Sequence, residues 1–233
     1  MKFGNVTLIT ANFNNAVLTR VMIMSLIKKN VFPNILIIDN STTEFFNVSP
    51  LETKMGIHVI NNQHYKLTKN WGKGELSKNH SHSLDYALST VTTKWAVLCD
   101  NDILFKPSIL SLFLELENTS YDIIGEIGYD AVKPDRLFPY LCFINMDAYK
   151  SNHLHFFDPT RCMCVRHDEH GNLCHLYDTG YSFYVDALAK HQTIKRIHLD
   201  DFCMHYLHAS QDVPSGTPKP SLTEWLMIHK DLY

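Results

Sequence analysis

The chain has 233 residues, of which 45% are hydrophobic and 19% charged, and its formal net charge is -3 at pH 7. This composition excludes a mainly disordered chain, because disorder requires low hydrophobicity and high net charge. The near-neutral balance argues against a nucleic-acid-binding protein, which needs a basic surface. The length suits one elaborated domain and is too short for two full-sized enzymatic domains.

The first hundred residues alternate strand and helix patterns. Short apolar runs predict four strands, at Val6–Ala11, Asn34–Ile38, Ile57–Asn61 and Lys94–Cys99. Helical spacing predicts a helix after Asn14 or Asn15, another capped by Ser77, and a third that begins at Pro107. This alternation is typical of a mostly parallel sheet flanked by helices. Residues 1–105 therefore resemble a nucleotide-binding α/β unit.

The second half changes character, and we expect a smaller antiparallel sheet or hairpin there. Predicted elements are strands at Ile123–Gly128, Leu137–Asn145 and Ile194–His198, a hairpin of Arg161–Arg166 with Leu173–Tyr177, and a helix from Thr179 to His191. A capping box at Ser221–Glu224 opens a last helix. We expect a single α/β domain, in which residues 106–212 form the second half and 213–233 a C-terminal tail.

No membrane-spanning or targeting segment is visible in the sequence. Apolar runs such as Val21–Ile27 are far below the roughly 18 residues that a span needs. The start of the chain lacks the long apolar region of a signal peptide. We therefore expect a cytoplasmic protein with reduced thiols, which could also work peripherally at a membrane face.

Polar clusters follow three of the predicted strands: Thr10-Ala11-Asn12, Asp39-Asn40-Ser41 and Asp100-Asn101-Asp102. In parallel sheets, ligands bind beyond the carboxyl ends of the strands. Two carboxylates spaced i, i+2 are suitable ligands for Mn²⁺ or Mg²⁺, which in turn hold phosphates. An ordinary polar turn is the alternative, but the position after a buried strand favours a metal–diphosphate site.

Gly-rich phosphate loops are missing from the sequence. Neither G-x-G-x-x-G nor G-x-x-x-x-G-K-[ST] occurs, which disfavours dinucleotide-dependent dehydrogenases and P-loop phosphotransferases. A diphosphate would have to be held by a metal and by basic side chains. Candidates are the lysines around one Gly-containing loop, although a solvated loop explains them equally: Lys66, Lys69, Lys73 and Lys78.

Four segments in order, VTLITANFNN, ILIIDNST, LSKNHSHSLDYAL and KWAVLCDNDILF, resemble the family 2-like GT-A glycosyltransferases over roughly residues 5–105. The resemblance implies a GT-A (Rossmann-like) fold whose Asp-x-Asp motif, Asp100 and Asp102, binds a metal on the sugar-nucleotide diphosphate. The sequence departs from the family at His80-Ser81-His82. The donor-binding residues that the resemblance implies are Thr10, Ala11, Asn12, Asp39, Lys78, Asn79, Asp100 and Asn101.

Further along the chain, two segments extend the resemblance. Asp178, before a predicted helix, matches the position of the catalytic base in inverting members, although Tyr177-Asp178 replaces the family's paired acids. Simple N-capping is the alternative for Asp178, and Asp147 and Asp158 are fallback bases. His205 begins an H-x-x-x-x-S segment whose histidine can complete the metal shell, with His208 as second choice and a surface or core histidine as the alternative.

Two other groups of residues each allow two interpretations. Cys162, Cys164 and Cys174, with nearby histidines, could hold a structural zinc or simply fill strands, whereas Cys99, Cys142 and Cys203 are interpreted as core thiols. Some aromatic side chains could form an acceptor platform, although most are expected in the core. These are Phe138, Tyr140, Phe143, Phe156, Phe157, Tyr181 and Tyr184.

The resemblance implies an enzyme that transfers a hexosyl or deoxyhexosyl group from a nucleoside-diphosphate sugar, with a UDP-sugar favoured, to a hydroxyl of a glycan or glycoconjugate. It further implies Mn²⁺ or Mg²⁺ as cofactor and inversion at the anomeric carbon. One alternative is a nucleotidyltransferase, although Thr10–Asn15 lacks the Gly-rich basic signature of that class. The other is an inactive module that binds a sugar nucleotide or a carbohydrate.

Overall fold

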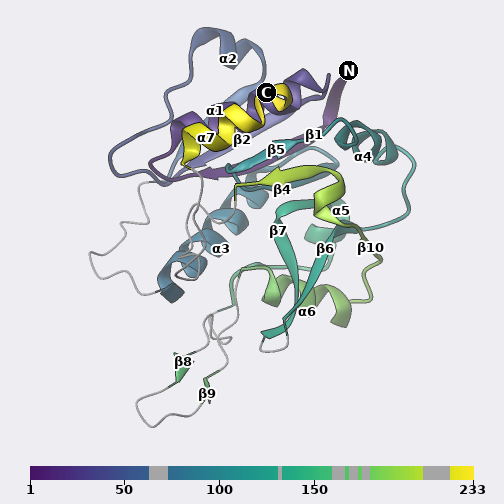
Figure 1. The fold of residues 1–233 in the computed structure, drawn as a ribbon. Helices are drawn as coiled ribbons and strands as arrows, with labels where there is room; N and C mark the ends of the chain where they lie inside the picture. The colour runs from purple at the N-terminus through teal and green to yellow at the C-terminus, as the bar shows by residue number, and fades with distance from the viewer. Residues whose placement is uncertain (63–72, 131–132, 159–165, 168–172, 175–178, 207–220) are drawn as a thin grey trace.

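A seven-stranded sheet forms the centre of the molecule, in the order β10-β6-β7-β4-β1-β2-β3 (Figure 1). The computed structural model describes all of residues 1–233 except 63–72, 131–132, 159–165, 168–172, 175–178 and 207–220. Neighbouring strands run parallel except at β7, which is antiparallel to both β4 and β6. The strands are β1 (Lys2–Asn12), β2 (Phe32–Asp39), β3 (Ile57–Asn61), β4 (Trp95–Cys99), β6 (Ile123–Asp130), β7 (Lys133–Asn145) and β10 (Ile194–Arg196).

Two small antiparallel sheets accompany the central one. The first pairs β5 (Ile103–Phe105) with β11 (Cys203–His205), and the second pairs β8 (Arg166–His167) with β9 (Leu173–Cys174). The helices are α1 (Ala16–Lys28), α2 (Pro50–Lys54), α3 (Lys73–Thr90), α4 (Ile109–Glu115), α5 (Met146–Ser151), α6 (Tyr181–Ala189) and α7 (Leu222–Ile228). The predicted mostly parallel sheet flanked by helices, with a smaller antiparallel sheet in the second half, is confirmed.

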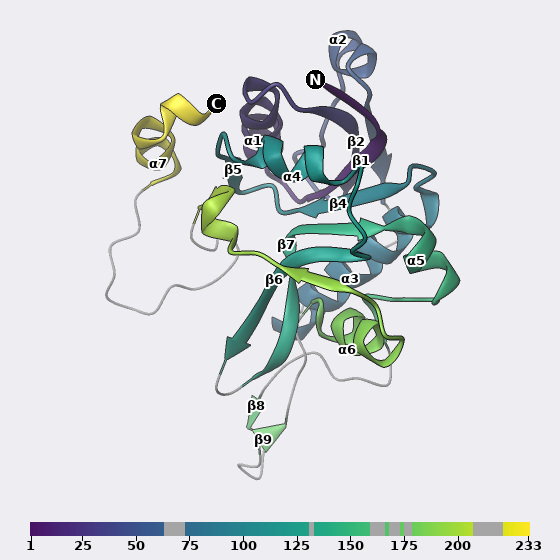
Figure 2. The same cartoon turned by 90° about the vertical axis from the view of Figure 1, so that its right-hand side faces the viewer.

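Hydrophobic cores lie on both faces of the sheet, because successive side chains of a strand point to opposite faces. Leu8 of β1 packs with Met22 of α1 and Phe113 of α4, whereas the next residue, Ile9, packs with Leu84 of α3. Figure 2 shows α1 and α4 on one side of the strands and α3 and α6 on the other. All five residues of β4 are buried, as expected of a central strand covered on both faces.

Several element boundaries differ from the sequence-based expectation. The helix predicted to start after Ser77 begins at Lys73, so Ser77 is inside α3 and does not cap it. Pro107 lies outside α4, whose N-cap is Ser108. Of the predicted hairpin, the described part is the short β8–β9 pair, which is antiparallel as expected. The sequence analysis missed β5, β11, α2 and α5, which are too short to give a periodic signal.

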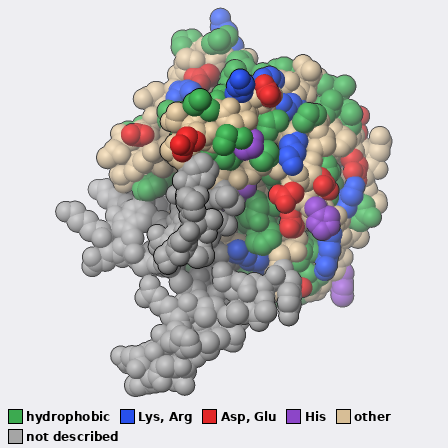
Figure 3. All heavy atoms as spheres, viewed as in Figure 1, with side chains coloured by type: hydrophobic (Ala, Val, Ile, Leu, Met, Phe, Trp, Pro, Cys, Tyr) green, Lys and Arg blue, Asp and Glu red, His purple; other side chains and the backbone are tan. Residues whose placement is uncertain are grey.

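The face of the molecule shown in Figure 3 carries no large patch of one charge sign among its described residues. Basic and acidic side chains are interspersed over the described part of that face, consistent with the small net charge of -3. Among the described residues, we find no helix with the length and hydropathy required to cross a membrane.

Candidate metal centre

The Asp-x-Asp motif forms the turn between the central strand β4 and the short strand β5. β5 pairs with β11 so that His205 lies opposite Ile103, the residue that follows Asp102. The backbone N–H of Tyr206 donates to the carbonyl oxygen of Asp102 over 2.8 Å. This small sheet therefore brings a histidine from near residue 200 to a turn near residue 100.

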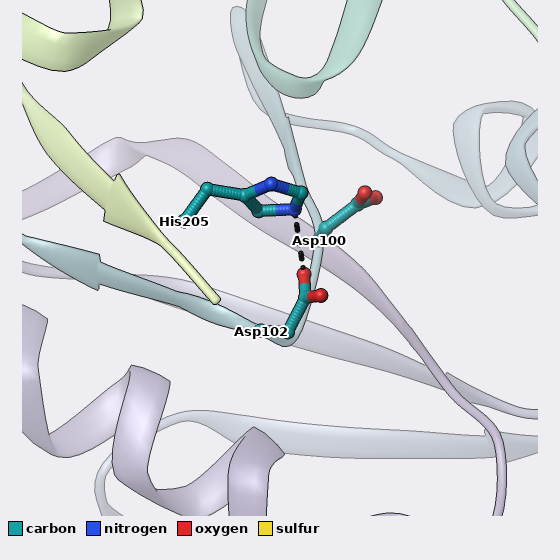
Figure 4. Close-up of side chains that lie close together, drawn as sticks. All are labelled: Asp100, Asp102 and His205. Atoms are coloured by element: carbon teal, nitrogen blue, oxygen red, sulfur yellow. Dashed lines mark ion pairs between the residues drawn. The ribbon is translucent and has the colours of Figure 1, made fainter. Parts of the chain in front are cut away.

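Asp100, Asp102 and His205 form a compact cluster at the carboxyl edge of the sheet. One ligand atom of each side chain lies within 4.8 Å of those of the other two. Figure 4 shows the imidazole of His205 directed at the turn, with its Nε2 atom 3.0 Å from Oδ1 of Asp102. The side chain of His205 is 22% exposed and that of Asp102 is 8% exposed. The cluster is therefore enclosed on the protein side and still reachable by a ligand.

The chemistry of this cluster fits a divalent metal ion. Two carboxylates and one imidazole supply oxygen and nitrogen ligands, and three protein ligands leave further positions for phosphate oxygens or water. A nearly buried carboxylate such as Asp102 also needs a cation or hydrogen-bond donors to offset its desolvation. Burial and the nearby Asp100 carboxylate raise the pKa of the neighbouring Cys99 thiol, which favours its neutral form.

A stack of side chains on β7 supports His205. The Tyr140 ring lies 5.1 Å from the imidazole at an interplanar angle of 12°, and Phe138 stacks on Tyr140 at 4.9 Å. The guanidinium of Arg136 lies 4.9 Å from the centre of the Phe138 ring. Burial, with a smaller contribution from the Glu126 carboxylate, raises the pKa of Tyr140, so its phenol is neutral. Packing within the protein thus accounts for the positions of Phe138 and Tyr140, two of the seven rings that were candidates for an acceptor platform.

The predicted donor-binding residues Asn12 and Asp39 are brought together at the ends of β1 and β2. Oδ1 of Asp39 accepts from Nδ2 of Asn12 (3.0 Å) and from the backbone N–H of Ser41 (3.1 Å). Oδ2 of Asp39 accepts from the backbone N–H of Phe46 over 2.6 Å. Asp39 is 2% exposed and Asn12 is fully buried. Both carboxylate oxygens of Asp39 therefore already accept protein hydrogen bonds.

Thr19 of α1 connects this pair to the Asp-x-Asp turn. Its hydroxyl donates to Oδ1 of Asn12 over 2.9 Å and accepts from Nδ2 of Asn101 over 3.1 Å. Thr19 is fully buried. The sequence analysis missed it, because a threonine in an amphipathic helix carries no signal of its own.

The remaining predicted donor-binding residues differ in accessibility. Thr10 is buried, whereas Ala11, Asn79 and Asp100 are half-buried. Lys78 belongs to α3, but its side chain lies outside the described part of the chain. Donor binding by all of these residues stays a prediction.

Several predicted site residues lie outside the described part of the chain. They are the proposed base Asp178, the alternative metal ligand His208, and the possible zinc ligands Cys162, Cys164 and, for its side chain, Cys174. The fallback base Asp147 is in α5, directly after the end of β7 that pairs with Trp95. Trp95 starts β4 and Asp100 follows its other end, so Asp147 is at the opposite edge of the sheet and is unsuited to that role.

A hollow of about 720 Å³ lies near the carboxyl ends of β2 and β3, beside the loop that Asp39 anchors. Asp39 is aligned with Asn12 on β1 and with Asn61 on β3, so the hollow is displaced along the sheet edge away from β4. Its lining residues are Thr43, Glu44, Phe45, Phe46, Asn47, Val48, Val59 and Asn61.

No protein-family model matches the sequence, and no curated protein matches it. Solved structures do resemble the fold. A mannosyltransferase, PcManGT, from Pyrobaculum calidifontis in complex with GDP-Man and Mn²⁺ gives a TM-score of 0.56 at 13% identity, covering 88% of this chain. The apo-form glycosyltransferase GlyE from Streptococcus pneumoniae gives 0.56 at 14% identity over 97% of this chain. The chain has the GT-A fold.

A third structure shares this architecture, at the lower TM-score of 0.50 and 13% identity over 90% of this chain. It is glucosyl-3-phosphoglycerate synthase from Mycobacterium tuberculosis in complex with Mn²⁺ and UDP-Glc, and this chain covers 72% of it. By contrast, this chain spans 58% of the PcManGT chain and 60% of the GlyE chain. Identities this low establish the GT-A fold alone, and the chemistry has to be argued from the site.

Proposed function

We propose that this chain is a metal-dependent glycosyltransferase, which transfers a hexosyl or deoxyhexosyl group from a UDP-sugar to a hydroxyl of a glycan or glycoconjugate. The observation that carries the proposal is the cluster of Asp100, Asp102 and His205 at the carboxyl edge of a GT-A sheet. The GT-A structures that resemble this chain include one with GDP-Man and one with UDP-Glc, each with Mn²⁺. Because their bases differ, the fold does not select the base, and our choice of UDP rests on the family resemblance.

In this proposal Asp102, Asp100 and His205 hold a Mn²⁺ ion. When bound, the metal would supply positive charge to the diphosphate, where negative charge develops as the nucleoside diphosphate departs. The chain itself contributes a rigid frame: Asp102 is fixed through the backbone bond from Tyr206, and His205 is fixed by the ring of Tyr140. Thr10, Ala11 and Asn12 are proposed to shape the nucleoside side of the site.

The acceptor half of the reaction is assigned to Asp178. We propose that its carboxylate takes the proton of the acceptor hydroxyl as that oxygen attacks the anomeric carbon, opposite the departing nucleotide, which inverts the configuration. Support for this role is the family resemblance, which has an acidic base at the start of the corresponding helix. Two residues further on, Gly180 is buried against β7, where an added Cβ would lie 2.0 Å from the carbonyl oxygen of Leu137.

A ligand panel tests the function. Thermal shifts with UDP-, GDP-, dTDP- and CMP-sugars, with and without Mn²⁺, should show stabilisation by the UDP-sugar in the presence of metal. Release of UDP from that sugar would then establish catalysis, whereas stabilisation without release would indicate a binding module. Release of pyrophosphate from a nucleoside triphosphate and a sugar phosphate would instead indicate a nucleotidyltransferase.

Asp102→Asn is the decisive variant, because it removes the charge of the more buried metal ligand and keeps its size. We expect transfer or hydrolysis to fall by roughly 10²–10³-fold, as for loss of a charge-stabilising group in other active sites, with Mn²⁺ binding lost in calorimetry. Asp147→Asn, at the exposed opposite edge, is the matched control and should retain activity. Full activity of Asp102→Asn, or wild-type activity without divalent metal, would refute the metal role.

A further inference from the structure

A continuous relay of hydrogen bonds, buried except at the half-buried Asn101, joins the Asp-x-Asp turn to the loop after β2. It runs from Asn101 to Thr19, from Thr19 to Asn12 and from Asn12 to Asp39, with lengths of 3.1, 2.9 and 3.0 Å. We propose that Thr19 is a positioning residue, which holds the turn and the 41–46 loop in one fixed arrangement. The reading of these loops as the diphosphate and nucleoside ends of one donor site rests on the proposed function.

The direction of every bond in this relay follows from Asp39. A carboxylate only accepts hydrogen bonds, so Asn12 must turn its NH₂ group toward Asp39 and its oxygen toward Thr19. An amide oxygen also only accepts, so the Thr19 hydroxyl is the donor in that bond, and its one proton is shared with the more distant carbonyl oxygen of Asn15. The remaining lone pairs of that hydroxyl can then accept from Asn101, whose amide orientation is fixed in turn.

Burial makes Thr19 hard to replace in this relay. Thr19 and Asn12 are fully buried and Asp39 is 2% exposed, so bulk water cannot substitute for a lost partner. The side chain is also restrained locally, because its hydroxyl lies 3.2 Å from the carbonyl oxygen of Asn15 in the preceding helical turn. A hydroxyl at this position of α1 is therefore required to satisfy groups that come from two other segments.

At the far end, the relay anchors a loop that lines the 720 Å³ hollow. Asp39 accepts the backbone N–H groups of Ser41 and Phe46. Between them, Oδ1 of Asn14 accepts the N–H groups of Thr42, Thr43 and Glu44 over 2.9, 2.9 and 3.2 Å. The loop is thus held by Asp39 at the end of β2 and by Asn14 just after β1. A change at Thr19 should therefore be transmitted to it through Asn12 and Asp39.

Hydrogen exchange of the full chain without ligand tests this proposal directly. Thr19→Val keeps the branched shape but removes the hydroxyl, and Thr19→Ser keeps the hydroxyl. We expect the valine variant to raise exchange about tenfold at the Ser41 and Phe46 amides and in the turn at residues 100–102, because one buried hydrogen bond is lost. The serine variant should stay close to wild type.

Thr7→Val is the matched control, because it removes a hydroxyl in the middle of β1, five residues before Asn12, where Thr7 is buried and bonds to Thr93. Exchange at the two loops should be unchanged in this variant. Wild-type exchange at both loops in Thr19→Val would overturn the proposal. If Thr19→Val does not fold, Thr19→Cys repeats the comparison with a similar size and only a weak donor.

Calorimetric titration with Mn²⁺ gives a second readout. Thr19→Val should bind Mn²⁺ about tenfold more weakly, as is typical when a hydrogen bond that supports the residues around a metal site is lost. Thr19→Ser should bind Mn²⁺ as wild type does. Failure of the wild-type chain to bind Mn²⁺ or any nucleotide would count against the proposed function. The exchange comparison needs no ligand, so it decides the positioning role separately.

Discussion

The two regions that build the candidate site hold their side chains by different means. At the ends of β1, β2 and β4, directional hydrogen bonds fix the buried Asn12 and Asp39 and the half-buried Asn101. On the side of β7 and β11, ring stacking and close backbone packing fix His205 and the start of α6. The first region specifies which atom of a side chain faces the site, whereas the second specifies the plane and position of a group.

This difference predicts opposite tolerances. A hydrogen-bonded network is harmed by isosteric changes that swap a donor for an acceptor, because each mismatch leaves a buried group unsatisfied. A stacked or closely packed region tolerates a change of polarity but not a change of shape. Substitutions that keep shape and change polarity, or the reverse, therefore separate the two regions.

Gly180→Ala should give the largest loss of stability. Gly180 has a φ of +93°, and an added Cβ would lie 2.0 Å from the backbone carbonyl oxygen of Leu137, which cannot move aside easily. Strain at positive φ and the overlap together should destabilise the fold by about 3 kcal/mol or more in urea unfolding. Gly4→Ala is the control, because no atom lies within 4 Å of its added Cβ. A loss below about 1 kcal/mol would show that α6 can shift away from β7.

Asp39→Asn should give the next largest effect. Three donors converge on the two oxygens of this buried carboxylate, and the amide of the variant would direct an NH₂ group at one of them. We expect about 2 kcal/mol of destabilisation in urea unfolding without any ligand. The exposed Asp147→Asn should change stability by less than about 1 kcal/mol.

The same variant distinguishes two roles for Asp39. If its main role were contact with the nucleobase, as the family resemblance implies, Asp39→Asn would unfold at the same urea concentration as wild type but lose stabilisation by the nucleotide. The structure instead favours a loss of stability in Asp39→Asn without ligand, because both carboxylate oxygens already accept hydrogen bonds within the protein.

The hydrogen-bonded region was the more predictable from sequence. Asp39, Asp100 and Asp102 follow apolar strands, and carboxylates at such positions have few explanations other than a turn or a site. What joins them could not be predicted, because Thr19 lies in a helix whose pattern only reports a core-facing stripe. The relay residues meet only in the folded chain, and no regular spacing between them in the sequence indicates that they are in contact.

The stacked region was less predictable. The resemblance placed His205 at the metal, but β5 and β11 have three residues each, too few for a period-two pattern to be seen. Arg136, Phe138 and Tyr140 alternate along β7, which the sequence analysis interpreted as a strand beginning only at Leu137. Their role becomes visible only when His205 is placed against Tyr140.

Tyr140 gives the smallest expected effect and the sharpest test of the second region. Tyr140→Phe keeps the ring that stacks on His205, whereas Tyr140→Leu replaces a planar surface by a branched one. Because a stacked pair contributes about 1 kcal/mol, Tyr140→Leu should weaken Mn²⁺ binding about fivefold to tenfold in calorimetry. Tyr140→Phe should bind within about twofold of wild type, because the neutral phenol hydroxyl adds nothing to the stacking plane.

Outcomes for the two Tyr140 variants separate stacking from other roles. Equal weakening in both would assign the effect to the hydroxyl, so this region too would depend on a polar group. Wild-type binding in Tyr140→Leu would show that the pairing of β5 with β11 orients His205 by itself. We expect Tyr140 to tolerate replacement by Phe, which keeps the ring and removes the hydroxyl, but not by Leu. At Thr19 we expect the reverse, because Thr19→Val keeps the shape, removes the hydroxyl and is harmful. The metal centre would then be held on one side by donor direction and on the other by shape.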